Sequence, residues 1–332
     1  MNRSDYIIRR VGIALFTIVF VTILNFFLFR VLPGDPARSL ARDPRLTAEA
    51  VAALRERFGL DKPLVINLES GNPFDSQFFR YLGNLVRGDL GISYNFNRPV
   101  ADLLGEYLIN TLLLVGVGEI LAILIGIALG IVAAWRRGTP LDVAALLFGL
   151  FTWALPTFFL GIILLIIGST YLGLPVAGSR TPGMDYAGPL EMIGDIGRHL
   201  AMPTLTLTVI LLGQYLLIMR SSLLDVLGED YILTARAKGL PDRQIMRDHA
   251  LRNAMLPMVT LIALTLGFTV SGSILIESVY SWPGLGRAVF DAVSRRDYPM
   301  LQGAFLLFTV SVVLANTAAD LLYAALDPRV RQ

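Results

Sequence analysis

The amino-acid sequence predicts an all-α integral membrane protein with six transmembrane helices, and its composition and apolar runs carry that prediction. Of its 332 residues, 55% are hydrophobic and only 16% are charged, whereas soluble globular proteins carry about 25% charged residues. Six apolar runs are each long enough to cross a hydrocarbon core, which takes about 20 helical residues. They cover residues 11–32, 111–134, 141–168, 200–219, 256–276 and 303–324.

The first apolar run could instead belong to a cleaved signal peptide, because Arg9 and Arg10 precede it. Signal peptides carry a shorter apolar region of about 7 to 15 residues, followed by a small-x-small cleavage site. This run is longer, and no such site follows it. We therefore expect residues 1–32 to form a cytoplasmic N-terminus and a retained first span.

Basic residues near the ends of the runs predict the orientation, because short cytoplasmic loops are enriched in lysine and arginine. If the N-terminus is inside the cell, most of these residues lie on the inner side. Both termini are then cytoplasmic, and residues 33–110 form a long extracytoplasmic segment whose own charges count for little. The two short outer loops hold only Arg180, Arg198, Arg287, Arg295 and Arg296.

The long outer segment contains a predicted helix. Thr47 can cap its start, and Val51, Leu54 and Phe58 recur at helical spacing before Gly59, a residue that suits the end of a helix. We expect an ordered subdomain here rather than a flexible tether.

Carboxylates inside the apolar runs are costly in a membrane and are functional candidates by default. Glu119 lies in the second run, and Asp320 lies towards the inner end of the last. Glu119 either faces a transport pathway or pairs with a polar group on another helix, and we favour pairing. Gly126 and Gly130 form a small-xxx-small pair, which predicts close helix packing.

A polar, helical stretch interrupts the apolar second half of the chain: YILTARAKGLPDRQIMRDHALRNAMLP, residues 231–257. Residues 229–238 lack helix breakers, and Gly239 suits a left-handed C-terminal cap. Pro241 and Asp242 suit the first turn of a second helix. The predicted element is a helix, a one-glycine corner and a second helix that leads into the fifth run.

Three uses of this element compete. A helix lying on the lipid surface is disfavoured, because acidic residues nearly cancel the basic ones and Tyr231, Ile232 and Leu233 point in different directions. A plain connector needs only about 2 to 8 residues, far fewer than lie between the fourth and fifth runs. Docking to a cytoplasmic partner is the third use, and the small side chains of Ala235 and Ala237 allow close approach. Physical reasoning alone leaves the last two open.

A second motif, SWPGLG at residues 281–286, follows the fifth run. Its proline and glycines permit a tight non-helical path, which is tolerated at a membrane boundary only if it is buried in protein or lines a wet cavity. We expect part of an outer gate, and the alternative is an interfacial turn anchored by Trp282 and Tyr280. The candidate gate and pathway residues are Glu277, Trp282, Pro283, Gly284 and Gly286.

Several catalytic and metal-binding motifs are absent from the sequence. It contains no G-x-x-x-x-G-K-[ST] phosphate loop, no H-E-x-x-H and no G-x-S-x-G, and its two histidines are His199 and His249. We therefore expect no catalytic residue, metal ligand or bound cofactor in this chain. A gradient-driven secondary transporter is the rival class, although such proteins usually carry internal repeats and buried ion-site carboxylates.

The segments TARAKGL at residues 234–240 and HALRNAMLP at residues 249–257 resemble the coupling-loop signature of bacterial ABC importer permeases of the peptide and nickel branch. Leu233 and Thr234 stand where the general signature has glutamate and alanine, so Leu233 inherits no role from that glutamate. The resemblance implies that the loop of residues 220–255 docks into an ATPase subunit. The coupling residues that it implies are Glu229, Tyr231, Thr234, Ala235, Arg236, Ala237, Lys238, Gly239 and Leu240.

Further motifs extend the resemblance over nearly the whole chain. In their order and spacing they resemble the first of the two permeases, the B-type subunit, of peptide transport systems. They are LPGDPA (32–37), FGLDKPL (58–64), GDLGISY (88–94), RPV (98–100), ESVYSWPGLGRAV (277–289), RDYPMLQG (296–303) and ADLLYAALDPRVR (319–331).

This resemblance implies a type I ABC importer permease fold in the bacterial inner membrane, with a peripheral first span and a permease core at residues 111–332. The implied partners are a second, homologous permease, two ABC ATPases that bind ATP and magnesium, an extracytoplasmic substrate-binding protein at residues 33–110, and membrane lipid. Nucleic acid is not among them. The implied cargo is di- or oligopeptides, and nickel complexes, glutathione and oligosaccharides remain alternatives.

Overall fold

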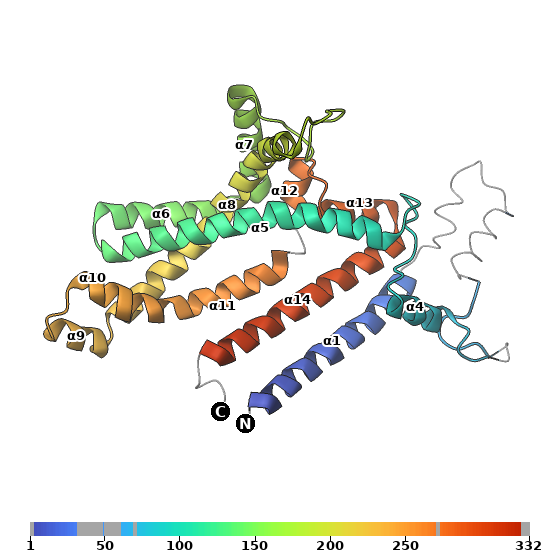
Figure 1. Ribbon diagram of the computed structural model, residues 1–332, viewed down its shortest axis with the longest axis horizontal. Coiled ribbons are helices and arrows are strands. Elements are labelled where there is room, and N and C mark those ends of the chain that lie inside the picture. The colour runs from blue at the N-terminus through green and yellow to red at the C-terminus, as the bar shows by residue number, and fades with distance from the viewer. Residues whose placement is uncertain (1–2, 32–48, 50–60, 69–71, 270–272, 327–332) are drawn as a thin grey trace. The chain divides into compact units, whose positions relative to one another are not determined.

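The computed structural model describes residues 3–31, 49, 61–68, 72–269 and 273–326 (Figure 1). Helices make up the regular structure of these residues, which contain no β-strand. The chain divides into two compact units, one built mainly from Asn110–Arg287 and the other from Asn2–Ile109 and Ala288–Leu314. Apart from residue 49, the predicted helix of the outer segment lies outside the described residues. So do the motif LPGDPA (32–37), residues 58–60 of FGLDKPL and the side chain of Asp320.

The unit that contains the N-terminus is held together by aromatic and polar contacts. Phe26 of α1 (Arg3–Val31) packs edge-on against Phe78 of α4 (Gln77–Val86), with ring centroids 5.2 Å apart. The amide of Asn25 donates to the Gln302 carbonyl of α14 (Tyr298–Leu326) at 2.9 Å. The buried carboxylate of Asp297 accepts hydrogen bonds from the backbone of Tyr94 and Asn95. These contacts join the first helix and the loop before α5 to the start of α14.

The other unit contains most of the apolar helices. It includes most of α5 (Val100–Trp135) and the first residues of α13 (Leu285–Arg295). Between them lie α6 (Pro140–Ala154), α7 (Thr157–Leu172), α8 (Pro189–Leu227), α9 (Asp230–Ala237), α10 (Asp242–Gln244), the π-helix η1 (Ile245–Ala250), α11 (Leu251–Thr269) and α12 (Ile274–Val279).

Helix α8 packs closely against α5 through the predicted glycine pair. A methyl group added at Gly126 would lie 2.6 Å from Cβ of Tyr215, and one at Gly130 would lie 2.7 Å from Cβ of Met219. Since real side chains do not approach so closely, only glycine permits this helix spacing. The pair therefore acts in helix packing, as its spacing predicts.

Among the described residues, α1, α5, α8 and α14 are each long and apolar enough to cross a membrane. Helices α6 and α7 pass the same test only together, and they meet at a bend of 101°. The single run expected at residues 141–168 is thus two helices. Pro156 explains the break, because it lacks a backbone N–H and forces the preceding Leu155 into an extended conformation.

Helices α5 and α8 also begin earlier than the apolar runs from which they were predicted, at Val100 and Pro189. The run expected at residues 256–276 corresponds to α11, which ends at Thr269, directly before residues outside the described part. The described residues therefore support four spans, or five if the bent pair counts as one. Six spans remain a prediction.

Candidate functional site

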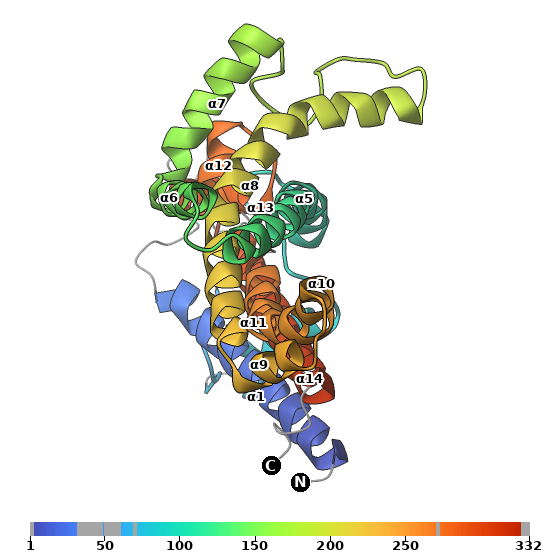
Figure 2. The same cartoon turned by 90° about the vertical axis from the view of Figure 1, so that its left-hand side faces the viewer.

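The polar stretch after α8 forms the predicted helix, corner and second helix. Helix α9 ends at Ala237, and Gly239 takes up the left-handed conformation with φ of +76°. The Gly239 N–H donates to the Arg236 carbonyl at 2.9 Å and so closes the corner. Pro241 then precedes α10, which continues through η1 into α11. Figure 2 shows α9 and α10 at the foot of α8, beside α11.

Buried apolar side chains fix this element to the membrane helices. Ile232 and Ala235 of α9 lie in one cluster with Ile245 and Met246 of η1 and with Leu223 of α8. The same cluster includes Ala254 and Met258 of α11, so α9 is connected to both α8 and α11 through packed side chains.

Two polar contacts reinforce that anchoring. The Asn253 amide of α11 donates to the Tyr231 hydroxyl at 2.8 Å, and the Ser222 hydroxyl of α8 donates to the Ala254 carbonyl at 2.9 Å. Both tie the element to the start of α11, which leads directly into the expected fifth span.

The remaining surface of the element is exposed. Of the predicted coupling residues only Ala235 is buried, and Leu240 is half-buried. Leu233, which carries no predicted role, exposes 56% of its surface and adds an apolar side chain to the same helix. A methyl group at Gly239 would meet no atom within 4 Å. The exposed coupling residues are Glu229, Tyr231, Thr234, Arg236, Ala237, Lys238 and Gly239.

The candidate gate residues gather around the carboxylate of Glu277, which is fully buried. Its Oε1 accepts a hydrogen bond of 2.9 Å from the Thr111 hydroxyl, and its Oε2 accepts one of 2.8 Å from the Arg287 N–H. A methyl group at Gly284 would lie 2.4 Å from Glu277 Cδ, and one at Gly286 would lie 3.1 Å from Oε2. The two glycines thus let the chain wrap closely around the carboxylate. Burial raises the pKa of the Glu277 carboxyl above its ordinary value.

Trp282 completes this loop and is fully buried. Its indole N–H donates to the Asn110 carbonyl at 3.0 Å, while the Asn110 amide donates to the Pro283 carbonyl at 2.9 Å. Tyr280 is also buried, and its hydroxyl donates to the Gly161 carbonyl of α7 at 2.9 Å. Both rings therefore pack inside the chain, and the alternative of an interfacial anchor lacks support.

The structure pairs Glu119 with other helices. Only 3% of this residue is exposed, and its carboxylate accepts a hydrogen bond from the Tyr215 hydroxyl of α8. The same hydroxyl lies 2.8 Å from Oγ1 of Thr265 in α11. The three side chains form a polar link across α5, α8 and α11, consistent with the pairing favoured from the sequence.

Three buried carboxylates were missed by the sequence reasoning: Asp297, described above, and Asp142 and Asp195. Asp142 forms a bidentate ion pair with Arg220, with Nε to Oδ1 at 2.6 Å and a terminal nitrogen to Oδ2 at 2.9 Å. Asp195 accepts from the Thr181 N–H at 2.8 Å and from the Tyr186 hydroxyl at 2.7 Å. Asp142 lies in an expected span, so the rule that flagged Glu119 applies to it as well.

Neither the coupling element nor the Glu277 loop provides a metal site. Within the described ranges, no group of three or more His, Cys, Asp or Glu side chains is placed to hold a metal ion. The exposed side chains of α9 and of the corner at Gly239 are accessible to another protein.

Two family models match this chain. The family described as "Binding-protein-dependent transport system inner membrane component" matches residues 126–332. The family described as "Binding-prot-dependent transport system membrane comp, N-term" matches residues 3–115. Together the two matches include α9, the corner at Gly239 and the Glu277 loop.

Curated relatives and one solved structure extend these matches. The glutathione transport system permease proteins GsiC of Escherichia coli strain K12 and of Salmonella paratyphi A are each 38% identical over 329 residues, which cover 98% of this chain and 99% of each relative. An inward-facing structure of the MetNI methionine ABC transporter matches with a TM-score of 0.53 and 20% identity. It covers 68% of this chain and 96% of the MetNI chain, and at this identity the likeness concerns the fold alone.

Proposed function

The chain belongs to the family of binding-protein-dependent transport system inner membrane components, and we propose from that premise that it forms half of a pathway for uptake of short peptides. It is a permease subunit of an ABC importer, a multi-pass membrane protein that works with ATPase subunits and a substrate-binding protein. Members of this family are non-catalytic components, so ATP and magnesium belong to the ATPase partners.

The observation that carries the coupling role is the contrast between the two faces of α9. Its inner face is locked to α8 and η1 through Ile232 and Ala235, whereas its outer face is exposed around the corner at Gly239. A surface that is exposed but rigidly connected to the membrane helices can transmit the closure of an ATPase to the pathway. ATP binding then biases the two states of the permease through this contact.

The remaining architecture follows from the same assignment. Six spans would place both termini in the cytoplasm and residues 33–110 outside, where they would meet the substrate-binding protein. A second, homologous permease would supply the other half of the pathway. The Glu277 loop, with its buried Trp282, would form part of the outer gate.

The proposed cargo is a di- or oligopeptide. The relatives named above transport glutathione, which is itself a short peptide derivative, and the motifs of this chain resemble the peptide and nickel branch. Nickel complexes, glutathione itself and oligosaccharides are the alternatives. The substrate-binding protein, rather than this chain, is expected to select among them.

Purification of the detergent-solubilised chain from its native membrane tests this proposal. We expect a second permease and P-loop ATPases to co-purify, and we expect the complex in vesicles to take up a labelled tripeptide only with ATP and the binding protein. Uptake by the chain alone that collapses with an uncoupler would instead favour a gradient-driven transporter. ATP-driven uptake of a nickel complex or an oligosaccharide, without peptide uptake, would overturn the proposed peptide cargo but not the importer assignment.

A further inference from the structure

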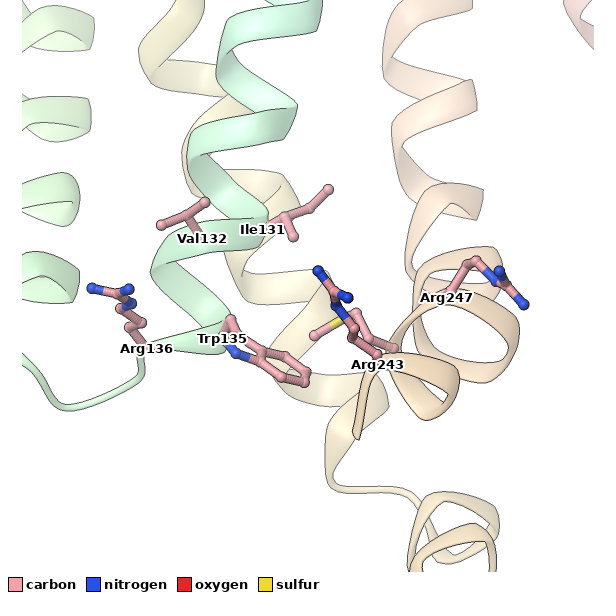
Figure 3. Close-up of a pocket in the computed structure, with 7 residues that line it drawn as sticks. Ile131, Val132, Trp135, Arg136, Arg243 and Arg247 are labelled. Carbon is pink, nitrogen blue, oxygen red and sulfur yellow. The ribbon is translucent and has the colours of Figure 1, made fainter. Parts of the chain in front are cut away.

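A groove of about 520 Å³ lies between the end of α5 and the segment that follows the Gly239 corner (Figure 3). Its volume is within the range of about 300 to 1,000 Å³ that is usual for ligand sites. It is lined by Ile131, Val132, Trp135, Arg136, Arg243, Met246 and Arg247.

The lining of this groove, called here the α5–α10 groove, is apolar on one side and cationic on the other. Ile131 and Val132 of α5 supply the apolar side, and Arg243 of α10 extends between Ile131 and Trp135 in Figure 3. Arg136 and Arg247 flank the groove and point outward. None of the described residues that line it carries a carboxylate.

Arg243 has a guanidinium group that is free to bind an anion. Within the described part of the chain, no carboxylate forms an ion pair with Arg243 or Arg136. Arg247 differs, since Asp248 already binds it through two contacts of 2.7 and 3.2 Å. Trp135 exposes 46% of its surface, and its indole N–H is a further donor. The groove therefore carries unneutralised positive charge.

The position of the groove identifies the kind of anion. Helix α5 is one of the spans long and apolar enough to cross a membrane, and it ends at Trp135. Tryptophan at the end of a span is typical of the membrane–water interface. A ligand here meets the apolar side chains of α5 on one side and arginine on the other. Basic pockets between helices at the cytoplasmic side are known as sites for anionic lipid headgroups.

We propose that the α5–α10 groove binds one anionic phospholipid, with its phosphate at Arg243 and an acyl chain along Ile131 and Val132. A lipid in the groove would contact α5 and the segment directly after Gly239 at the same time. It would therefore brace the coupling element against the membrane, a consequence that rests on the function proposed above. The binding itself rests on that proposal only for the cytoplasmic position of the groove, and it does not depend on transport activity.

Native mass spectrometry of the solubilised chain, with whatever subunits co-purify, tests the proposal by counting bound lipids. Phosphatidylglycerol and zwitterionic phosphatidylcholine are titrated separately. We expect one phosphatidylglycerol to bind in preference to phosphatidylcholine. Arg243→Gln should weaken that binding about fivefold, the effect of one basic residue near an anionic surface, and Arg243→Lys should keep most of it.

Arg252→Gln is the matched control, because it removes an exposed arginine of α11 that does not line the groove. Equal phosphatidylglycerol binding by wild type and Arg243→Gln would overturn the proposal. So would an Arg243→Gln variant that loses its ATPase subunits but keeps its lipid, since the groove would then be a protein contact. The preference for phosphatidylglycerol is measured whichever subunits co-purify. A failure of the importer assignment would be seen in the identity of those subunits, and it is therefore distinguishable from a failure of lipid binding.

Discussion

The hydroxyl of Thr111 donates a hydrogen bond of 2.9 Å to the buried carboxylate of Glu277 and accepts one of 2.7 Å from the Leu285 N–H. One small side chain of α5 thus connects the end of α12 to the start of α13. Both ends of the SWPGLG loop are held at this point, so its conformation depends on a residue far away in the sequence.

Replacing Thr111 tests that connection. Thr111→Val keeps the shape of the side chain but removes both hydrogen bonds, and it should destabilise the chain by about 1 to 3 kcal/mol because buried polar groups lose their partner. Thr111→Ser keeps the hydroxyl and is the control. Thermal unfolding of the solubilised complex provides the measurement, and equal melting temperatures for the two variants would contradict this role.

Gly284 should tolerate no side chain. In Gly284→Ala the new methyl group would meet the Glu277 carboxylate at 2.4 Å, and the resulting strain should cost about 1 to 3 kcal/mol and reduce ATP-driven uptake. Gly83→Ala is the matched control, because a methyl group at Gly83 meets no atom within 4 Å. If both alanine variants transport at the wild-type rate, the close approach of Gly284 to Glu277 is not required for transport.

Gly239 should be required for its backbone conformation rather than for its size. The space around it is open, but a β-branched residue is strained at its positive φ, by about 1 to 2 kcal/mol. Gly239→Val should therefore uncouple ATP hydrolysis from uptake, whereas Gly239→Asn should keep most coupling because asparagine tolerates this conformation. ATPase and uptake rates are measured on the same vesicles. Full coupling in the valine variant would show that the corner is not needed.

The ion pair between Asp142 and Arg220 should be needed for folding. Asp142→Ala leaves the partly buried guanidinium of Arg220 without its partner, which typically costs about 3 to 5 kcal/mol. Adding Arg220→Met should recover part of the loss, because the uncompensated charge is then gone. A double variant less stable than Asp142→Ala would refute that explanation. The yield and melting temperature of the solubilised chain distinguish these outcomes.

Substitutions at Glu119 and Tyr215 distinguish a structural role for Glu119 from a role in the transport pathway. If Glu119 acts structurally, Tyr215→Phe should lower the melting temperature and leave the preference among peptide substrates unchanged. Glu119→Gln can still accept a hydrogen bond, so its stability should stay near that of the wild type. A stable Glu119→Gln variant with altered peptide preference would instead place this carboxylate in the pathway.

Local features of this fold were predictable from the sequence, and long-range ones were not. The corner at Gly239 and the packing at Gly126 follow from the properties of single residues and from spacing. Pro156 could also have been recognised as a candidate break in the third run, because proline removes a backbone hydrogen bond inside a helix, although α8 and α11 continue through Pro203 and Pro257. The apolar runs located α1, α5, α8 and α14 but set the ends of α5 and α8 too narrowly, since these two helices continue into more polar sequence.

Contacts between distant residues explain what the sequence reasoning missed. Glu277 was recognised as a gate candidate, but neither its partner Thr111 nor its contact with Gly284 is visible in any local pattern. Nothing near Arg220 in the sequence points to Asp142 as its partner. Tertiary packing of helices decides such pairs, and a single sequence carries no record of it.

The uninterrupted stretch of α8 that follows Pro203 is long enough to act as a lever arm. Between Pro203 and Leu227 lie about 36 Å of helix at 1.5 Å per residue, and the cluster that contains Ile232 packs against α8 from Leu211 to its Leu227 end. A swing of about 5° about that end would carry the Pro203 end sideways by about 3 Å at this rise per residue. That displacement is about the width of one water molecule. A small rotation of a docked ATPase would thus produce a larger displacement at the far end of α8. That displacement would change which solutes can pass there.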